Sequence, residues 1–298
     1  MAGLGNHIGT HFVLRAQMNG NLYANGQWLM IWYYDRGAGS QGFMDDRFVP
    51  SAHIEAIEGQ LTSVEFQNDS PMQHTIHFHG LDVDQANDGV PATSFAVYPF
   101  GSFTYQFVAP HAGTYHYHCH VDTTIHYEKG MYGTVIVRPP SGSTSEAWTG
   151  GPTFDEEVLW QLGTMDTSWN NENAPGPATA RFYPDVFLLN GKETADARVD
   201  PFTRVAVTAG QKAYIRVLNS SYNWARVSLG GLPFQVVASD GRPLQSALAS
   251  GVLELGPGER YDLLVQPLRP GTWSAHIDYT DGLTGAVVGG VQTDIVAV

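Results

Sequence analysis

Basic residues are scarce in this chain of 298 residues, which has 15 Lys and Arg against 29 Asp and Glu and a formal net charge of −14. An acidic surface repels polyanions, so neither a nucleic acid nor an anionic membrane surface is expected as a partner. No apolar run approaches the roughly 20 residues that cross a bilayer, which argues against membrane insertion. The first residues, MAGLGNH, also lack the basic head and apolar stretch of a secretory leader.

Cysteine is nearly absent as well. Cys119 is the single cysteine, so an intrachain disulfide is excluded. A lone cysteine in a chain of this size is usually a small buried hydrophobe. Here its neighbours argue for chemistry, because most of the 12 histidines lie between positions 74 and 126.

Long helical periodicity is missing too. Short runs rich in Val, Thr, Tyr and Phe are bounded by Gly, Pro, Asn and Asp, a pattern typical of strands and turns. Such runs occupy Ser63–Phe66, Ser102–Val108, Gly133–Val137, Ala213–Leu218, Phe234–Ala238 and Tyr261–Val265. A short helix is expected near Tyr127 or within 142–150. We therefore predict an all-β fold of two sandwiches.

The domain boundary is predicted at the segment RPPSGSTS (138–145), where two prolines and small polar residues follow a strand-like run. The domains would then span residues 1–140 and 141–298. Two segments repeat in the same order: 58–68 matches 209–219, and 111–120 matches 269–278. This indicates a duplicated β-domain, with chance similarity between strand–turn units as the alternative.

Two histidine-rich segments carry the candidate chemistry, HTIHFHG (74–80) and HYHCHVDTTIHYEKGM (116–131). Alternate side chains of a strand point to opposite faces. His77 and His79 therefore share one face and His74 takes the other. By the same rule Cys119 points away from a face that is shared by His116, His118 and His120. The sequence predicts two ligand sets, back to back.

The first set, His74 and Cys119, is completed by His126 and Met131 from the following loop. Two imidazoles, a thiolate and a weak thioether are the blue-copper ligands of electron transfer. The second set holds only imidazoles and suits a catalytic copper with open positions. Zinc would bind it too, but would make no use of the adjoining His–Cys–Met group. A buried histidine is usually just hydrogen-bonded and most methionines fill core space, yet so many histidines alternating around one cysteine indicate metal ligands.

These motifs resemble the multicopper oxidases, specifically the small two-domain kind with the blue copper in domain one. The resemblance covers most of the chain, from about Val49 onward. HTIHFHG is similar to that family's first histidine motif, and HCHVDTTIHYEKGM to its cysteine motif, with a longer Cys-to-His gap than in laccases. In the second half, FLLNGK, VVASDG and LGPGERYDLLV also resemble the family. The resemblance implies two cupredoxin-like Greek-key β-sandwich domains and a type 1 copper in the first.

The resemblance also implies roles for single residues. His74, Cys119 and His126 match the type 1 ligands, with Met131 axial. The other matches are His77 to a type 2 ligand and His79, His118 and His120 to type 3 ligands. Asp88, in NDGVP, resembles the acid that helps to deliver protons to oxygen, although an Asp-Gly pair is more often a turn. His77 and Asp88 are thus the candidate catalytic residues, and the role of His116 stays open between ligand, channel wall and outer support.

Domain two departs from the family pattern. By the repeat, Ala225, Ser228 and Gly230 stand where domain one has His74, His77 and His79, and Asp278 stands opposite His120. His276, opposite His118, is the sole histidine of this half. A trinuclear copper cluster shared with a neighbouring subunit therefore lacks most of its second half.

The remaining pattern resembles copper nitrite reductase, whose type 2 copper takes two histidines from domain one and one from the neighbour's domain two. By position these are His79, His118 and His276, which implies a homotrimer with a copper at each subunit interface. The match is imperfect, because His77 stands where that enzyme has an aspartate and its second catalytic histidine is missing near Val227.

The expected function is that of a copper oxidoreductase. A type 1 copper would accept electrons from a small-molecule or protein donor and pass them through His-Cys-His to an interfacial copper that reduces oxygen or a nitrogen oxide. The alternative is a blue-copper electron-transfer or copper-binding protein with a degenerate catalytic centre. On the family resemblance, we expect a periplasmic or secreted protein whose leader has been removed.

Overall fold

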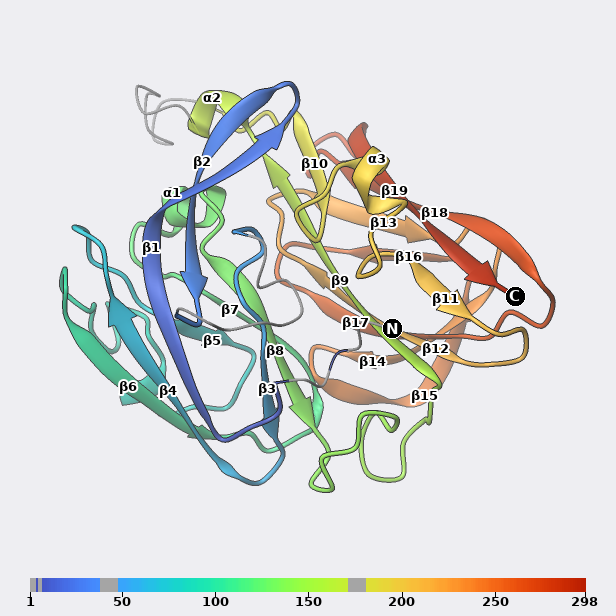
Figure 1. Cartoon of the computed structure of the whole chain (residues 1–298), viewed down its shortest axis with the longest axis horizontal. Coiled ribbons are helices and arrows are strands. Elements are labelled where there is room, and N and C mark those ends of the chain that lie inside the picture. The colour runs from blue at the N-terminus through green and yellow to red at the C-terminus, as the bar shows by residue number, and fades with distance from the viewer. Residues whose placement is uncertain (1–3, 5–6, 38–47, 171–180) are drawn as a thin grey trace.

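The computed structural model describes residues 4, 7–37, 48–170 and 181–298. In these ranges the chain forms four sheets, two in each half, and Figure 1 shows the halves lying side by side. The helices are single short turns beside the sheets. The predicted all-β fold of two sandwiches is confirmed.

The first domain packs two four-stranded sheets over one core. The first sheet, in the order β2-β1-β4-β6, consists of β2 (Gln27–Asp35), β1 (His11–Ala24), β4 (Leu61–Asn68) and β6 (Ser102–Val108). The second, β3-β8-β7-β5, consists of β3 (Ile54–Ile57), β8 (Tyr132–Arg138), β7 (Gly113–His118) and β5 (His77–His79). Buried residues of both sheets, such as Leu14, Phe66 and Val135, form one apolar cluster that also contains Cys119. Two short helices, η1 (Gln85–Asn87) and α1 (Thr123–Glu128), lie in its loops.

The second domain repeats this architecture with more strands. One sheet is ordered β10-β9-β12-β17-β14-β15, from β10 (Val186–Leu189), β9 (Glu156–Met165), β12 (Ala213–Asn219), β17 (Arg260–Val265), β14 (Phe234–Ser239) and β15 (Arg242–Ser250). The other is ordered β11-β19-β18-β13-β16, from β11 (Val205–Val207), β19 (Val287–Ala297), β18 (Gly271–Thr280), β13 (Trp224–Ser228) and β16 (Val252–Leu255). The helices are α2 (Thr167–Asn170) and α3 (Thr194–Ala197).

The runs predicted as strands all lie within strands of the structure, namely β4, β6, β8, β12, β14 and β17. Helix α1 contains Tyr127, whereas 142–150 forms turns and bends. Prolines and glycines that flank this segment favour tight turns over a continuous helix. The predicted boundary at 140/141 lies between β8 and β9.

Strand pairing shows the duplication directly. In domain one β4 runs parallel to β1 and antiparallel to β6, and in domain two β12 runs parallel to β9 and antiparallel to β17. The second sheets also agree: β8–β7–β5 and β19–β18–β13 are both antiparallel series. In register, His77 lies opposite His118 on β5 and β7, and Ser228 lies opposite His276 on β13 and β18. The repeat therefore places Ser228 where domain one has His77.

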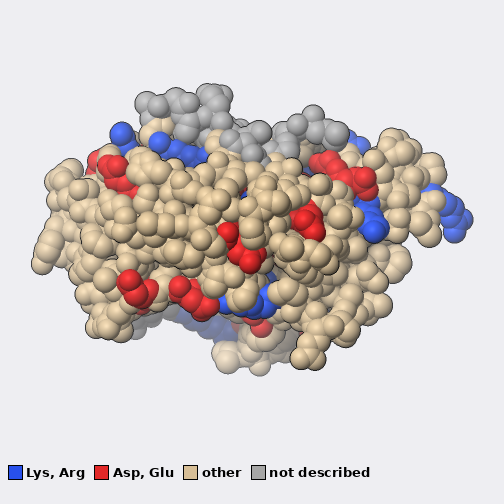
Figure 2. All heavy atoms as spheres, turned by 90° about the horizontal axis from the view of Figure 1, so that it is seen from below, with Lys and Arg blue, Asp and Glu red and all other residues tan. Residues whose placement is uncertain are grey.

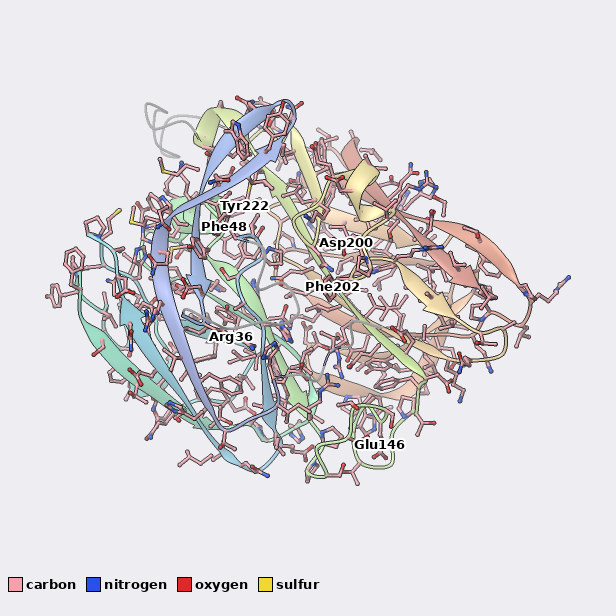
Figure 3. All side chains as sticks on the ribbon, viewed as in Figure 1. Arg36, Phe48, Glu146, Asp200, Phe202 and Tyr222 are labelled. Atoms are coloured by element: carbon pink, nitrogen blue, oxygen red, sulfur yellow. The ribbon has the colours of Figure 1, made fainter. Side chains whose placement is uncertain are left out.

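An apolar cluster joins the domains near the β1–β2 hairpin. It combines Leu29, Ile31 and Val49 of the first domain with Met165 and Leu188 of the second. Phe48 packs against the same cluster, and Figure 3 shows Phe48 and Tyr222 at the junction between the two halves. The Tyr222 hydroxyl donates to the carbonyl oxygen of Thr124 in α1, 2.7 Å away, so domain two also contacts the loop that follows Cys119.

A buried ionic network joins the domains at the other sheets. Arg138, at the end of β8, contacts Glu55 at 2.6 Å and Glu157 of β9 at 2.8 Å. Glu157 also accepts from Arg216 Nε at 2.7 Å, and Arg216 NH1 donates to Thr114 Oγ1 at 2.8 Å. The side chains of Arg138 and Arg216 are both fully buried. The buried charges of this network therefore depend on one another for the solvation that water no longer supplies, and the Arg138–Glu157 pair joins the two domains.

The surface is sparsely charged. On the face in Figure 2, acidic side chains lie scattered over a mostly uncharged surface, and Lys and Arg appear in small groups near its edges.

The buried network makes a prediction about stability. Replacing Arg138 by Met leaves the buried Glu55 carboxylate without its arginine and leaves Glu157 with Arg216 alone, which should lower the free energy of unfolding by about 3–5 kcal/mol. The matched control is Arg226→Met, which removes an ion pair with Glu254 whose side chains are 51% and 61% exposed and should cost less than about 1 kcal/mol. Denaturant unfolding of both variants measures the difference. Equal losses would show that the network does not hold the domains together.

Candidate metal centres

The first candidate centre lies inside the first sandwich. His74 pairs with Val97 in an isolated bridge, Cys119 directly follows β7, and His126 belongs to α1. The Cys119 sulfur lies 3.6 Å from His74 Nδ1 and 3.2 Å from His126 Nδ1. The two Nδ1 atoms are 3.2 Å apart. All three side chains are buried, so three donor atoms converge on one enclosed point.

The loop that brings these residues together is closed by its own backbone. Cys119 N donates to the carbonyl oxygen of Met131 at 3.0 Å, and Met131 N donates to that of His126 at 3.0 Å. Met131 is fully buried in the same apolar cluster as Cys119. The Cys119–Met131 segment thus folds back on itself and carries Met131 into the core cluster that also contains Cys119.

The protonation of this group fits a metal ion. Burial, together with the neighbouring His126, lowers the pKa of His74 to about 3, and burial lowers the pKa of His126 to about 4. Both imidazoles are therefore neutral near pH 7 and have a lone pair to donate. Burial also raises the pKa of the Cys119 thiol, so metal binding would have to displace its proton. Two neutral imidazoles, a thiol and a nearby thioether are the donor set that copper prefers.

The second candidate centre lies on the opposite face of the same strands. His77 and His79 extend from β5 and His118 from β7, and one ligand atom of each lies within 4.8 Å of the others. The His77 and His118 ring centres are 5.1 Å apart, and those of His79 and His118 are 5.8 Å apart. The structure thus separates His74 and Cys119 from His77, His79 and His118, the arrangement expected from strand alternation.

Hydrogen bonds fix which nitrogen of these rings is available. His77 Nδ1 donates to the carbonyl oxygen of Asp88 at 2.8 Å and lies 3.3 Å from its carboxylate. His118 Nδ1 donates to the carbonyl oxygen of Cys119 at 2.9 Å. The Nε2 lone pairs of both rings are therefore left for a metal. Burial is the main cause that lowers the pKa of His79 to about 4 and of His118 to about 3.

The other predicted residues take different places. His120 stacks on His118 with a ring-centre distance of 5.9 Å and lies 5.4 Å from the His77 ring, beside the three-histidine group. His116 is buried, 3.4 Å from Ser220 Oγ and 3.5 Å from the Tyr127 hydroxyl. Within the described ranges of this single chain, His276 joins neither group and lies on β18 opposite Ser228 and Gln292.

Two contacts of these centres are not expected from the sequence. Arg260 and Gly258, from domain two, adjoin His79: a side chain at Gly258 would lie 3.2 Å from the His79 ring, and Arg260 helps to lower the pKa of His79. Trp32, from β2, contacts the rings of His74 and His126. Gly258 and Arg260 belong to the motif LGPGERYDLLV, but nothing in this motif shows which histidine they contact. No local signal marks Trp32.

Comparison with known proteins supplies the family. Two family models, both described as multicopper oxidase, match residues 31–142 and 161–297. Among curated proteins the chain is similar to Laccase-3 of Botryotinia fuckeliana, with 30% identity over 223 residues that cover 72% of this chain and 47% of the relative. It is also similar to the multicopper oxidase MmcO of Mycobacterium tuberculosis, with 27% identity over 241 residues that cover 73% of this chain and 46% of the relative. The chain spans about half the length of these relatives.

Solved structures agree with this result. The blue copper oxidase from Nitrosomonas europaea matches with a TM-score of 0.78 and 25% identity, over 96% of this chain and 85% of that one. The multicopper oxidase mgLAC matches with a TM-score of 0.74 and 25% identity, over 96% and 86%. The two family models together cover most of the chain, and both metal groups have the donors that copper takes. This chain belongs to the multicopper oxidase family, and copper is its cofactor.

Proposed function

We propose that this chain is a copper-dependent oxidoreductase of the laccase-like kind, which oxidises a small-molecule or protein donor and reduces oxygen or a nitrogen oxide. The observation that supports this most strongly is the pair of donor groups on opposite faces of β5 and β7. An electron carrier needs one of these groups, whereas an oxidase needs both. The laccases and multicopper oxidases among the relatives favour the oxidase in the same way.

Copper bound to both groups would supply one-electron redox chemistry at each. His74, Cys119 and His126 would hold the blue copper in this proposal, with the thioether of Met131 as a further donor. Cys119 connects the two groups, since it is covalently joined to His118 and His120 on either side. The hydrogen bond from His118 Nδ1 to the Cys119 carbonyl oxygen adds a second link of 2.9 Å. The path between thiolate and imidazole therefore consists of a few bonds of rigid strand.

His77 and Asp88 form the proton-handling pair of this proposal. The Asp88 side chain is 28% exposed and lies 3.3 Å from His77 Nδ1, so it reaches both water and the imidazole group. Thr93 Oγ1 donates to Asp88 Oδ2 at 3.1 Å and holds the carboxylate in place. Asp88 thus orients the His77 ring and offers an oxygen that can accept and release protons beside the second group.

His276 completes the second group across a subunit interface in this proposal. Its place on β18 matches that of His118 on β7, and its side chain lies on the partly exposed face of the outer sheet of domain two. We propose a cyclic homotrimer in which His276 of the partner subunit joins His79 and His118, with His77 and His120 beside them. Closed rings with head-to-tail interfaces are an ordinary way to build such shared sites.

A periplasmic or secreted location is part of the same proposal and rests on the family resemblance. Among the helices that the structure describes, none has the length and apolar character needed to span a bilayer.

The blue site is tested by Cys119→Ser. A serine hydroxyl fills nearly the same space but is a poor copper ligand at neutral pH, so the intense thiolate-to-copper absorption and electron transfer should be lost while the fold is retained. Visible absorption and circular dichroism of the copper-loaded protein measure both. His11→Ala, outside both groups, should keep the colour. Blue absorption that survives in Cys119→Ser would refute the ligand assignment.

The proton-handling pair is tested by Asp88→Asn, which keeps the shape but removes the carboxylate charge. Turnover should fall about 10- to 100-fold, the usual cost of losing a group that supports a metal ligand, while the blue absorption stays unchanged. Asp84→Asn is the matched control, because the Asp84 carboxylate contacts Asn87 rather than a histidine. Equal losses of turnover in the two variants would mean that Asp88 acts only through the shape of its loop.

The shared interface is tested by His276→Ala. The variant should lose the second copper and turnover but keep the blue absorption, and light scattering of the wild type should give the mass of a trimer. Gln292→Ala, which alters the cross-strand neighbour of His276, is the control and should keep both coppers. A monomeric wild type with a fully loaded second site would contradict the shared interface.

A further inference from the structure

Trp32 covers the blue-copper group from the side of β2, the edge strand of its sheet. Its indole stands edge-on against the His126 ring, at 5.2 Å and 75°, and against the His74 ring, at 6.4 Å and 76°. Both histidines are 0% exposed, and Trp32 itself is 8% exposed. The indole therefore lies over both imidazole ligands and has only a narrow edge in contact with solvent.

The backbone fixes this contact. Trp32 N donates to the carbonyl oxygen of Lys129 at 2.9 Å, which ties β2 to the loop that carries His126 and Met131. Gly130, which follows Lys129, has φ +106°. A side chain there would lie 3.2 Å from Ile31 and 3.3 Å from the Trp32 carbonyl oxygen. The chain thus uses a glycine to bring the ligand loop against β2, and the indole has little freedom to move away.

The polar atoms around the indole indicate a dry site. Trp32 Nε1, His74 Nε2 and His126 Nε2 are all buried and make no hydrogen bond. Each would bind water if water reached it, because an unpaired buried donor or acceptor is costly. Burying these three polar atoms without a partner costs free energy, and the Trp32 side chain keeps water away from them.

The polarity and charge around the two imidazoles also affect the reduction potential of a bound metal. An apolar, water-free shell disfavours the more highly charged oxidised ion and so raises the reduction potential of a bound metal. Lys129 Nζ lies over the indole, 5.8 Å from its centre, and adds positive charge there. Lys129 is itself buried and donates to the carbonyl oxygen of Asn170. Both the seal and the nearby cation favour Cu(I) over Cu(II).

We propose that Trp32 is a positioning residue that raises the reduction potential of the blue copper by sealing both imidazole ligands from water. The inference rests on the blue-copper assignment in the proposed function and adds the residue that sets how readily the site accepts an electron. The donors it favours are accordingly weak reductants, since a high-potential acceptor can still oxidise them.

The test is a redox titration of the copper-loaded protein, followed by its blue absorption. Trp32→Ala should shift the relative affinity for the two oxidation states at least tenfold toward Cu(II), a drop of about 59 mV for a one-electron couple. Trp32→Phe keeps an apolar ring over the imidazoles and should shift that relative affinity less than threefold. If the alanine variant does not fold, Trp32→Leu takes its place, with a drop in the same direction.

Trp169→Ala is the matched control. Trp169 is 7% exposed, has an indole N–H without a hydrogen-bond partner, and packs against Phe182 instead of an imidazole. Trp169→Ala should therefore leave the reduction potential of the blue copper unchanged. A folded, blue Trp32→Ala or Trp32→Leu variant with the wild-type potential would overturn the inference alone, as would an equal drop in Trp169→Ala. A wild type without blue absorption would overturn it together with the proposed function.

Discussion

Antiparallel pairing of β5 with β7 is the interaction on which both metal groups depend. It places His77 opposite His118 and His79 opposite His116. Because side chains alternate across a strand, the residues next to these histidines point into the sandwich, where Cys119 meets His74 and His126. A slip of one residue in this pairing would exchange the two faces and destroy both groups at once. The register of one short strand pair therefore positions both donor groups together.

The rest of the molecule holds that strand pair in place. Arg138 and Arg216 connect the sheet of β7 and β8 to domain two through buried carboxylates. Domain two also places Gly258 and Arg260 against His79, and β2 places Trp32 against the imidazoles of His74 and His126. Domain two has kept the sandwich and its strand order but not the histidines of domain one, with the exception of His276. In this chain it supports the strand pair, and in the proposed trimer it would also supply one imidazole to a neighbour.

Much of this arrangement could be predicted from the sequence, because it depends on local alternation. The separation of His77 and His79 from His74, and of His118 from Cys119, follows from strand geometry alone. The strand runs and the duplication were likewise visible in short patterns. Trp32 and Arg260 could not be found in this way, since each reaches its histidine across a large sequence separation and through packing that no local pattern encodes. The role proposed for His276 depends on an assembly of chains, so neither its sequence position nor a single folded chain determines it.

The central claim is that two copper sites share one strand pair. Copper analysis of the purified, fully loaded protein, combined with electron paramagnetic resonance, tests it most directly. Two donor groups predict two copper ions per chain, one with the narrow hyperfine splitting of a thiolate-bound blue copper and one with the wide splitting of an imidazole-bound copper. One copper per chain, with the blue signal alone, would contradict the account and identify an electron carrier.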